Sequence, residues 1–82
     1  MNYIVYVIQN PDGKLYIGHT NNLERRLSEH NKRYSRYTSS WLGPWLLVHQ
    51  EVFRTRAQAM KREKELKTGV GREFLKSILG KG

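Results

Sequence analysis

The sequence predicts a small α+β domain, in which a three-stranded antiparallel sheet is flanked by helices in the order β-β-α-β-α-α. Three observations predict it: a hairpin signal near the N-terminus, a third β-rich run in mid-chain, and helical periodicity in the segments around that run. With 82 residues and no cysteine, the chain has room for a single domain over 1–82. Packing must stabilise this domain, because disulfides and cysteine-bound zinc are excluded.

The predicted strands are three runs rich in β-branched and aromatic residues. The first two, 3–9 and 14–18, flank a turn sequence containing Asp12 and Gly13, so we expect them to pair as an antiparallel hairpin. The third run, 45–53, follows a glycine-proline pair, and its first half is continuously apolar. Such a run is typical of a strand that is covered on both faces, which predicts a central place in the sheet.

Three segments show the spacing of apolar residues that is typical of helices. The first, about 22–32, follows an Asx cap at Asn21. The second, about 55–68, opens on a threonine capping box, and we expect it to stop at Gly69 in a left-handed conformation. The third covers 72–79. Helices after a hairpin and a lone strand favour packing on the faces of a small sheet.

The composition indicates a polyanionic partner. Fifteen Lys and Arg against seven Asp and Glu give a formal net charge of +8, which concentrates polyanions, most commonly nucleic acid. Charge alone leaves ribosomal-type binding, membrane-surface binding and plain solubility open. The N-terminal residues lack a basic n-region and a cleavage site, and no apolar stretch approaches membrane length, so we expect a cytoplasmic protein, monomeric by default, with no membrane partner.

Four residues of the hairpin and the first helix could carry chemistry. Tyr6 and Tyr16 alternate with aliphatic residues on the predicted strands, although aromatic residues are ordinary in strands. Arg26 and His30 are four residues apart and project from one face of the helix, where an arginine can grip phosphate and a histidine can transfer a proton. A solvated basic face is the alternative for this pair.

Glu63 is the least ordinary residue of the second predicted helix. It falls on the same helical face as Ala59, Met60 and Leu66, so it interrupts an apolar stripe that should meet the core. A buried carboxylate requires a partner, and a divalent metal or a cation such as Arg26 would supply one. The alternative is a rim glutamate paired with an arginine or lysine in solvent. Paired-carboxylate and His/Cys clusters are absent from the sequence, which disfavours a two-metal nuclease.

In their order along the chain, these residues resemble the GIY-YIG endonuclease family, in a version close to its short single-domain bacterial proteins. Those proteins are related to the nuclease domains of the excision-repair incision subunit and of a structure-specific eukaryotic resolvase. The segment Tyr16-Ile17-Gly18 reproduces the second family motif literally, and the likeness extends over about 3–79. Ile4 stands where the first motif has glycine. The positions that match the functional residues of the family are Tyr6, Tyr16, Arg26, His30 and Glu63.

The resemblance implies a metal-dependent endonuclease that hydrolyses phosphodiester bonds in DNA, is guided by DNA structure, and has a role in repair or recombination. Tyr16, as phenolate or through a relay with His19, would activate the attacking water. Glu63 would hold one Mg²⁺ or Mn²⁺ at the scissile phosphate. The side chains that would stabilise charge or orient water and phosphate are Arg26, Tyr6 and His30.

Further basic and aromatic residues are expected to contact flanking phosphates and exposed bases. Such contacts confer affinity and not sequence choice. Two alternatives remain: a nucleic-acid-binding module with little turnover, and a protein-interaction domain with an acidic partner. We expect Trp41 and Trp45 to belong to the core or its lid, and His49 to pack on the third strand. The predicted nucleic-acid contacts are Lys32, Arg33, Tyr34, Arg36, Tyr37, Arg54, Arg56, Lys61 and Lys64.

Overall fold

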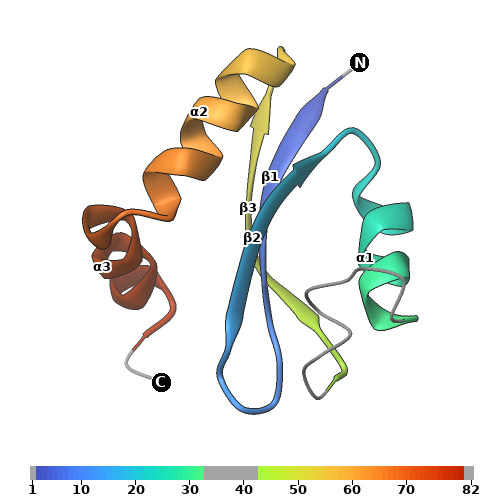
Figure 1. Cartoon of the computed structure of the whole chain (residues 1–82), viewed down its shortest axis with the longest axis vertical. Coiled ribbons are helices and arrows are strands. Elements are labelled where there is room, and N and C mark those ends of the chain that lie inside the picture. Colours follow the sequence, from blue (N-terminus) through green and yellow to red (C-terminus); the bar gives the residue numbers. More distant parts are fainter. Residues whose placement is uncertain (1, 33–42, 81–82) are drawn as a thin grey trace.

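A computed structural model describes residues 2–32 and 43–80 and confirms the predicted α+β fold, with helices on both faces of a three-stranded antiparallel sheet. In Figure 1, α1 covers one face of the sheet, while α2 and α3 cover the other. None of the helices within the described ranges has the length and apolar character needed to cross a membrane. The elements are β1 (Tyr3–Gln9), β2 (Leu15–Thr20), α1 (Leu23–Asn31), β3 (Leu46–Phe53), α2 (Arg56–Leu66) and α3 (Gly69–Ile78).

Strand β1 lies in the centre of the sheet and divides the core into two layers. Val5 and Val7 face α2 and α3, where they join one buried cluster. Tyr6 and Ile8 project from the other face and pack with Trp45 in a second cluster that includes residues of α1. Alternation along this one strand therefore decides which side chains meet which helix.

The β1–β2 turn is held by a side chain that the sequence prediction did not single out. The Asn10 side-chain oxygen accepts hydrogen bonds from the backbone N–H groups of Asp12, at 3.1 Å, and Lys14, at 2.8 Å. Gly13 adopts a φ of +86°, which a residue with a side chain rarely adopts. The turn sets a register that places Tyr6 opposite Gly18.

The prediction of a central position for β3 was wrong, because the strand order is β2-β1-β3 and β3 lies at an edge. The pairing with β1 shifts between Val7 and Ile8, since Val7 pairs with His49 and Ile8 pairs with Leu47. Val48 is left as the extra residue of a β-bulge. Leu47 packs in one cluster and Val48 in the other, so both faces of β3 are covered, and the apolar run reflects this cover and not a central position.

The two ends of α1 are fixed by asparagine side chains. The N-cap is Asn22, one residue later than predicted, and its side chain accepts a hydrogen bond from the N–H of Arg25 at 3.0 Å. At the other end, the Asn31 amide donates to the carbonyl of Trp45 at 3.0 Å and accepts from the Trp45 N–H at 2.6 Å. This double contact ties α1 to the start of β3. Trp45 is buried, as the sequence predicted.

Helices α2 and α3 follow each other with almost no connection. Thr55 caps α2, as predicted, by accepting a hydrogen bond from the N–H of Gln58. The predicted left-handed stop at Gly69 was wrong: α2 ends at Leu66, and Gly69 is the first residue of α3, whose N-cap is Thr68. A further correction concerns Met60, which is 51% exposed and does not join the buried stripe that was predicted for α2.

Candidate active site

Gly18 allows two tyrosines to lie together on the α1 face of the hairpin. A side-chain carbon placed at Gly18 would lie 2.7 Å from the Tyr6 hydroxyl, closer than side-chain carbons are found, and 3.1 Å from the Tyr16 ring, a tight contact. The ring centroids of Tyr6 and Tyr16 are 6.2 Å apart, and the Tyr16 ring lies 4.7 Å from that of His30. The glycine of the second motif thus has a packing role here.

Tyr6 and His30 form a buried, neutral hydrogen-bonded pair. The Tyr6 hydroxyl lies 2.8 Å from His30 Nε2, and each residue is only 1% exposed. Burial raises the pKa of Tyr6 to about 12, against the opposing influence of Arg26. Burial, reinforced by the charge of Arg26, lowers the pKa of His30 to about 4. At neutral pH the pair is uncharged, and it packs directly against the Tyr16 ring.

Arg26 is a cation beside the two tyrosines on this face. Its guanidinium donates to Glu29 at 3.0 Å, and about a third of the side chain is exposed. Burial works to lower the pKa of Arg26, but Glu29 and the two tyrosines raise it well above its ordinary value, so the group stays charged. Arg26 was one predicted partner of Glu63. The structure pairs it with Glu29 instead, within the same helix.

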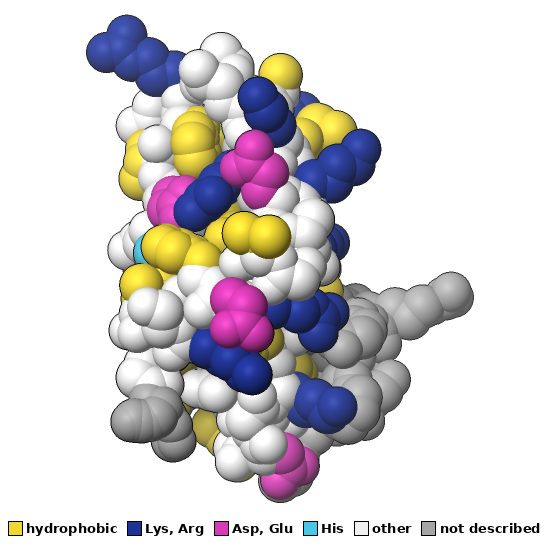
Figure 2. Space-filling model, turned by 90° about the vertical axis from the view of Figure 1, so that its left-hand side faces the viewer, with side chains coloured by type: hydrophobic (Ala, Val, Ile, Leu, Met, Phe, Trp, Pro, Cys, Tyr) yellow, Lys and Arg dark blue, Asp and Glu magenta, His cyan; other side chains and the backbone are white. Residues whose placement is uncertain are grey.

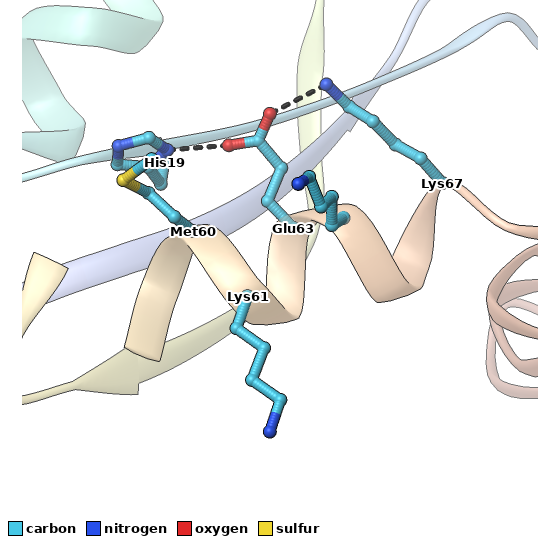
Figure 3. Close-up of a pocket in the computed structure, with 6 residues that line it drawn as sticks. His19, Met60, Lys61, Glu63 and Lys67 are labelled. Atoms are coloured by element: carbon cyan, nitrogen blue, oxygen red, sulfur yellow. Dashed lines mark hydrogen bonds and ion pairs between the residues drawn. The ribbon is translucent and has the colours of Figure 1, made fainter. Parts of the chain in front are cut away.

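Glu63 belongs to α2, on the other face of the sheet, and both of its oxygens are engaged. One oxygen lies 2.6 Å from His19 Nδ1, and the other accepts from Lys67 Nζ at 2.6 Å (Figure 3). Burial acts to raise the pKa of Glu63, but the hydrogen bonds and charges of His19 and Lys67 outweigh it and lower the pKa below its ordinary value. The carboxylate is therefore ionised at neutral pH. The Glu63–Lys67 pair has the i, i+4 spacing that could have revealed Lys67 from sequence.

The outer edge of β2 is where the hollows that Tyr16 and Glu63 line adjoin each other. Tyr16 is in contact with the α1-side cluster, whereas His19, three residues further along β2, bonds to α2, so the two side chains project from opposite faces. The relay between them does not form in this structure. Two surface hollows nevertheless meet at this edge, one lined by Tyr16 and the other by His19 and Glu63, and Lys67 lines both.

The fit of a metal to this site depends on one carboxylate. Within residues 2–32 and 43–80, no group of three or more potential metal ligands comes together. An ionised, half-buried Glu63 beside the His19 imidazole can serve as the single protein carboxylate for Mg²⁺, which keeps several waters and takes further oxygens from phosphate. Lys67, half of whose side chain is exposed, would have to give up one Glu63 oxygen.

The predicted nucleic-acid contacts are distributed over several parts of the surface. Lys61 and Lys64 line the hollow of Glu63, although Lys61 points away from the carboxylate in Figure 3. The Arg56 guanidinium lies over the Tyr3 ring, 5.2 Å from its centroid. Lys32 and Arg54 are exposed. The predicted contacts Arg33, Tyr34, Arg36 and Tyr37, and the predicted core residue Trp41, lie outside the described residues.

Comparison with known proteins identifies the class that this fold and arrangement define. The family model of the GIY-YIG catalytic domain matches residues 2–74, and the chain belongs to the GIY-YIG family. Ile4, which replaces the first-motif glycine, is accommodated as a partly buried residue of β1.

Several bacterial proteins similar to this chain carry the name UPF0213 protein. The one from Staphylococcus haemolyticus is 39% identical over 77 residues, which cover 93% of each chain. The one from Desulfotalea psychrophila is 45% identical over 67 residues, which cover 79% of this chain and 60% of the relative. A solution NMR structure of the UPF0213 protein from Bacillus halodurans matches with a TM-score of 0.58 and 31% identity, over 95% of this chain and 85% of that one.

Proposed function

We propose that this protein is a metal-dependent endonuclease that hydrolyses phosphodiester bonds in DNA. One observation carries the proposal: Tyr16 and Glu63 line adjoining hollows at the outer edge of β2, and Lys67 belongs to both. A phosphate placed at this edge would have a phenol on one side and a carboxylate on the other. Membership of the GIY-YIG family supports the same chemistry.

Each side chain has a distinct task in the proposed reaction. Tyr16, as phenolate, would accept the proton of the attacking water and become the neutral phenol, while the neutral Tyr6–His30 pair holds its ring in position. Arg26, which stays charged, would stabilise the negative charge that develops on the phosphate. His19 would orient the Glu63 carboxylate through its Nδ1 contact. A Mg²⁺ or Mn²⁺ ion held by Glu63 would neutralise phosphate charge.

The proposed substrates are distinguished by shape. Lysine and arginine contacts to phosphate fix the position of a nucleic acid without reading its sequence. The basic residues around the site, such as Lys61, Lys64 and Lys67, are of this type. We therefore propose branched, flapped or single-stranded DNA as substrates, with repair or recombination as the corresponding setting.

Two matched pairs of variants test the assignment. Glu63→Gln and Tyr16→Phe should each lower single-turnover cleavage of flapped DNA in Mg²⁺ or Mn²⁺ by about a hundredfold or more, as expected for removal of a charge-stabilising group or a general base. The controls are Glu65→Gln, an exposed neighbour on α2 that pairs with Arg62, and Tyr3→Phe on the other face of β1. The controls should cleave as fast as the unaltered protein. Equal cleavage by all four variants would show that Glu63 and Tyr16 do not have the proposed roles.

A nucleic-acid-binding module with little turnover is the second candidate. The observation that favours it is the engagement of both Glu63 oxygens by His19 and Lys67, because a metal must then displace an existing ion pair. In that case the protein should bind DNA with an affinity that falls steeply as salt is raised. Cleavage should be equally slow in the unaltered protein and in Glu63→Gln.

A further inference from the structure

We propose that the outer edge of β2 binds one phosphodiester strand that runs from the candidate centre, the surroundings of Glu63, towards the β1–β2 turn. Three basic residues would hold this strand: Lys67, Arg72 and Lys14. This inference rests on the proposed function, since it assumes that the partner is a nucleic acid. It assigns a binding role to three basic residues, two of which, Arg72 and Lys14, lie outside the candidate centre.

Three hollows that share lining residues follow one another along this edge, and together they are called the groove. The hollow of Glu63 and the hollow of Tyr16 share Lys67. The hollow of Tyr16 also shares three of its lining residues with a third hollow, which reaches the β1–β2 turn at Gly13 and Lys14. The shared residues of the second and third hollows are Leu15, Ile17 and Arg72. The groove therefore runs the length of β2, from the carboxylate to the turn.

The charge of the groove fits a polyanion. Lys67 stands where the first two hollows join, Arg72 where the second and third join, and Lys14 lies at the far end. Glu63 is the acidic residue among those that line the three hollows, and it lies at the end where the proposed reaction takes place. Figure 2 shows the face formed by α2 and α3, on which basic side chains alternate with a few acidic and apolar ones. The groove thus offers cations at intervals, as a phosphate backbone requires.

The dimensions and the backbone of β2 also suit an extended strand. β2 has six residues, and a β-strand rises about 3.4 Å per residue, so the edge is about 20 Å long. An extended single strand advances further per nucleotide than the roughly 3.4 Å of stacked bases in a duplex, so the edge can accompany a few nucleotides. Among the described strands, β2 pairs with β1 on one side. The backbone N–H groups along its other side are of the kind that commonly donates to phosphate oxygens.

Binding measured without divalent metal tests the groove separately from cleavage. Fluorescence anisotropy of a labelled single-stranded oligonucleotide of about 12 nucleotides, in EDTA and across about 50–200 mM salt, gives both affinity and salt slope. Lys14→Gln and Arg72→Gln should each weaken binding roughly five- to tenfold at about 100 mM salt and flatten the slope by about 0.7. The matched control is Lys76→Gln, an exposed residue of α3 that is not among the groove-lining residues. It should bind within about twofold of the unaltered protein.

The outcomes separate this inference from the function on which it rests. One outcome is that the unaltered protein binds DNA while Lys14→Gln, Arg72→Gln and Lys76→Gln all weaken binding equally. That result would show that the groove is not the binding path for DNA, and it would leave the proposed endonuclease function unaffected. If the unaltered protein binds no DNA, the function fails as well. Polyglutamate serves as a competing ligand. If it binds as tightly as DNA, and if Arg72→Gln weakens that binding, the groove binds acidic proteins and the inference is overturned. Amide NMR shifts on DNA addition, expected to be largest along 13–18, provide a readout that needs no variant.

Discussion

On the α1 face of the sheet, Tyr6 and His30 are almost inaccessible and neutral, whereas on the α2 face Glu63 is ionised, partly exposed and held by His19 and Lys67. The first arrangement is fixed by burial, because neither partner can turn to water without losing its hydrogen bond. The second depends on charge and includes a lysine whose side chain is half exposed, so its contacts can be exchanged for a ligand. The Tyr6–His30 pair therefore keeps the side chains of the α1 face in fixed positions. The Glu63 carboxylate is a charged group whose lysine partner can be replaced by a ligand.

The largest expected effect concerns acid stability and comes from His30. Its pKa falls from an ordinary 6.5 to about 4 in the folded protein, so the unfolded chain takes up the proton first as pH falls. Stability should therefore be lost between about pH 6.5 and pH 4, by about 3 kcal/mol, since each pKa unit corresponds to about 1.4 kcal/mol. Denaturant unfolding at several pH values measures the loss.

The variant His30→Gln provides the control for the acid experiment. It removes the titrating group, so its stability should change less over this pH range than that of the unaltered protein. Carboxylates with lowered pKa values, such as Glu51 and Glu63, also contribute to acid loss and remain in both proteins. An identical pH slope in the two proteins would show that His30 is not held neutral by burial.

A smaller effect is expected at Gly18, where the two tyrosines meet. Gly18→Ala would force the Tyr6 hydroxyl to move, because the added carbon would lie 2.7 Å from it. Overpacking of this kind costs about 1–3 kcal/mol. The matched control is Gly69→Ala at the start of α3, where an added carbon meets nothing within 4 Å. Equal free energies of unfolding for both variants would contradict the close packing of Tyr6 over β2.

The smallest effect on stability is expected at Lys67. Lys67→Gln removes an ion pair that is half exposed, so the free energy of unfolding should change by less than about 1 kcal/mol. The same variant frees one oxygen of Glu63, so Mn²⁺ should bind at least as tightly as to the unaltered protein, as measured by calorimetry. A loss of more than about 2 kcal/mol, or weaker Mn²⁺ binding, would show that Lys67 is a structural part of the site and not an exchangeable partner.

Much of the fold could be predicted from local sequence, because periodicity, turn residues and caps are local signals. The Asp12–Gly13 turn and the Thr55 cap are examples that the structure confirms. The position of β3 could not be predicted, since an edge strand and a central strand that are covered on both faces produce the same apolar run. The prediction for Gly69 was wrong because a glycine can begin a helix as well as end one. Here the Thr68 side chain caps α3 by accepting a hydrogen bond from the N–H of Gly71, so Gly69 begins that helix.

The candidate site shows the same division. The spacing of Arg26 and His30 placed both on one helical face, and the interruption of an apolar stripe singled out Glu63. Sequence could not show that His30 would turn inward to Tyr6, or that Glu63 would bond to His19 from a strand 44 residues away in the chain. Those contacts are set by the packing of helices against both faces of the sheet, which no local pattern records.

Paramagnetic broadening by Mn²⁺ in the presence of a short DNA strand tests most directly whether Tyr16 and Glu63 serve one phosphate site. If they do, amide NMR signals of Tyr16, His19 and Glu63 should all broaden at substoichiometric Mn²⁺, and Glu63→Gln should abolish the effect while Glu65→Gln preserves it. Broadening that leaves Tyr16 unaffected, or that persists in Glu63→Gln, would contradict the shared site.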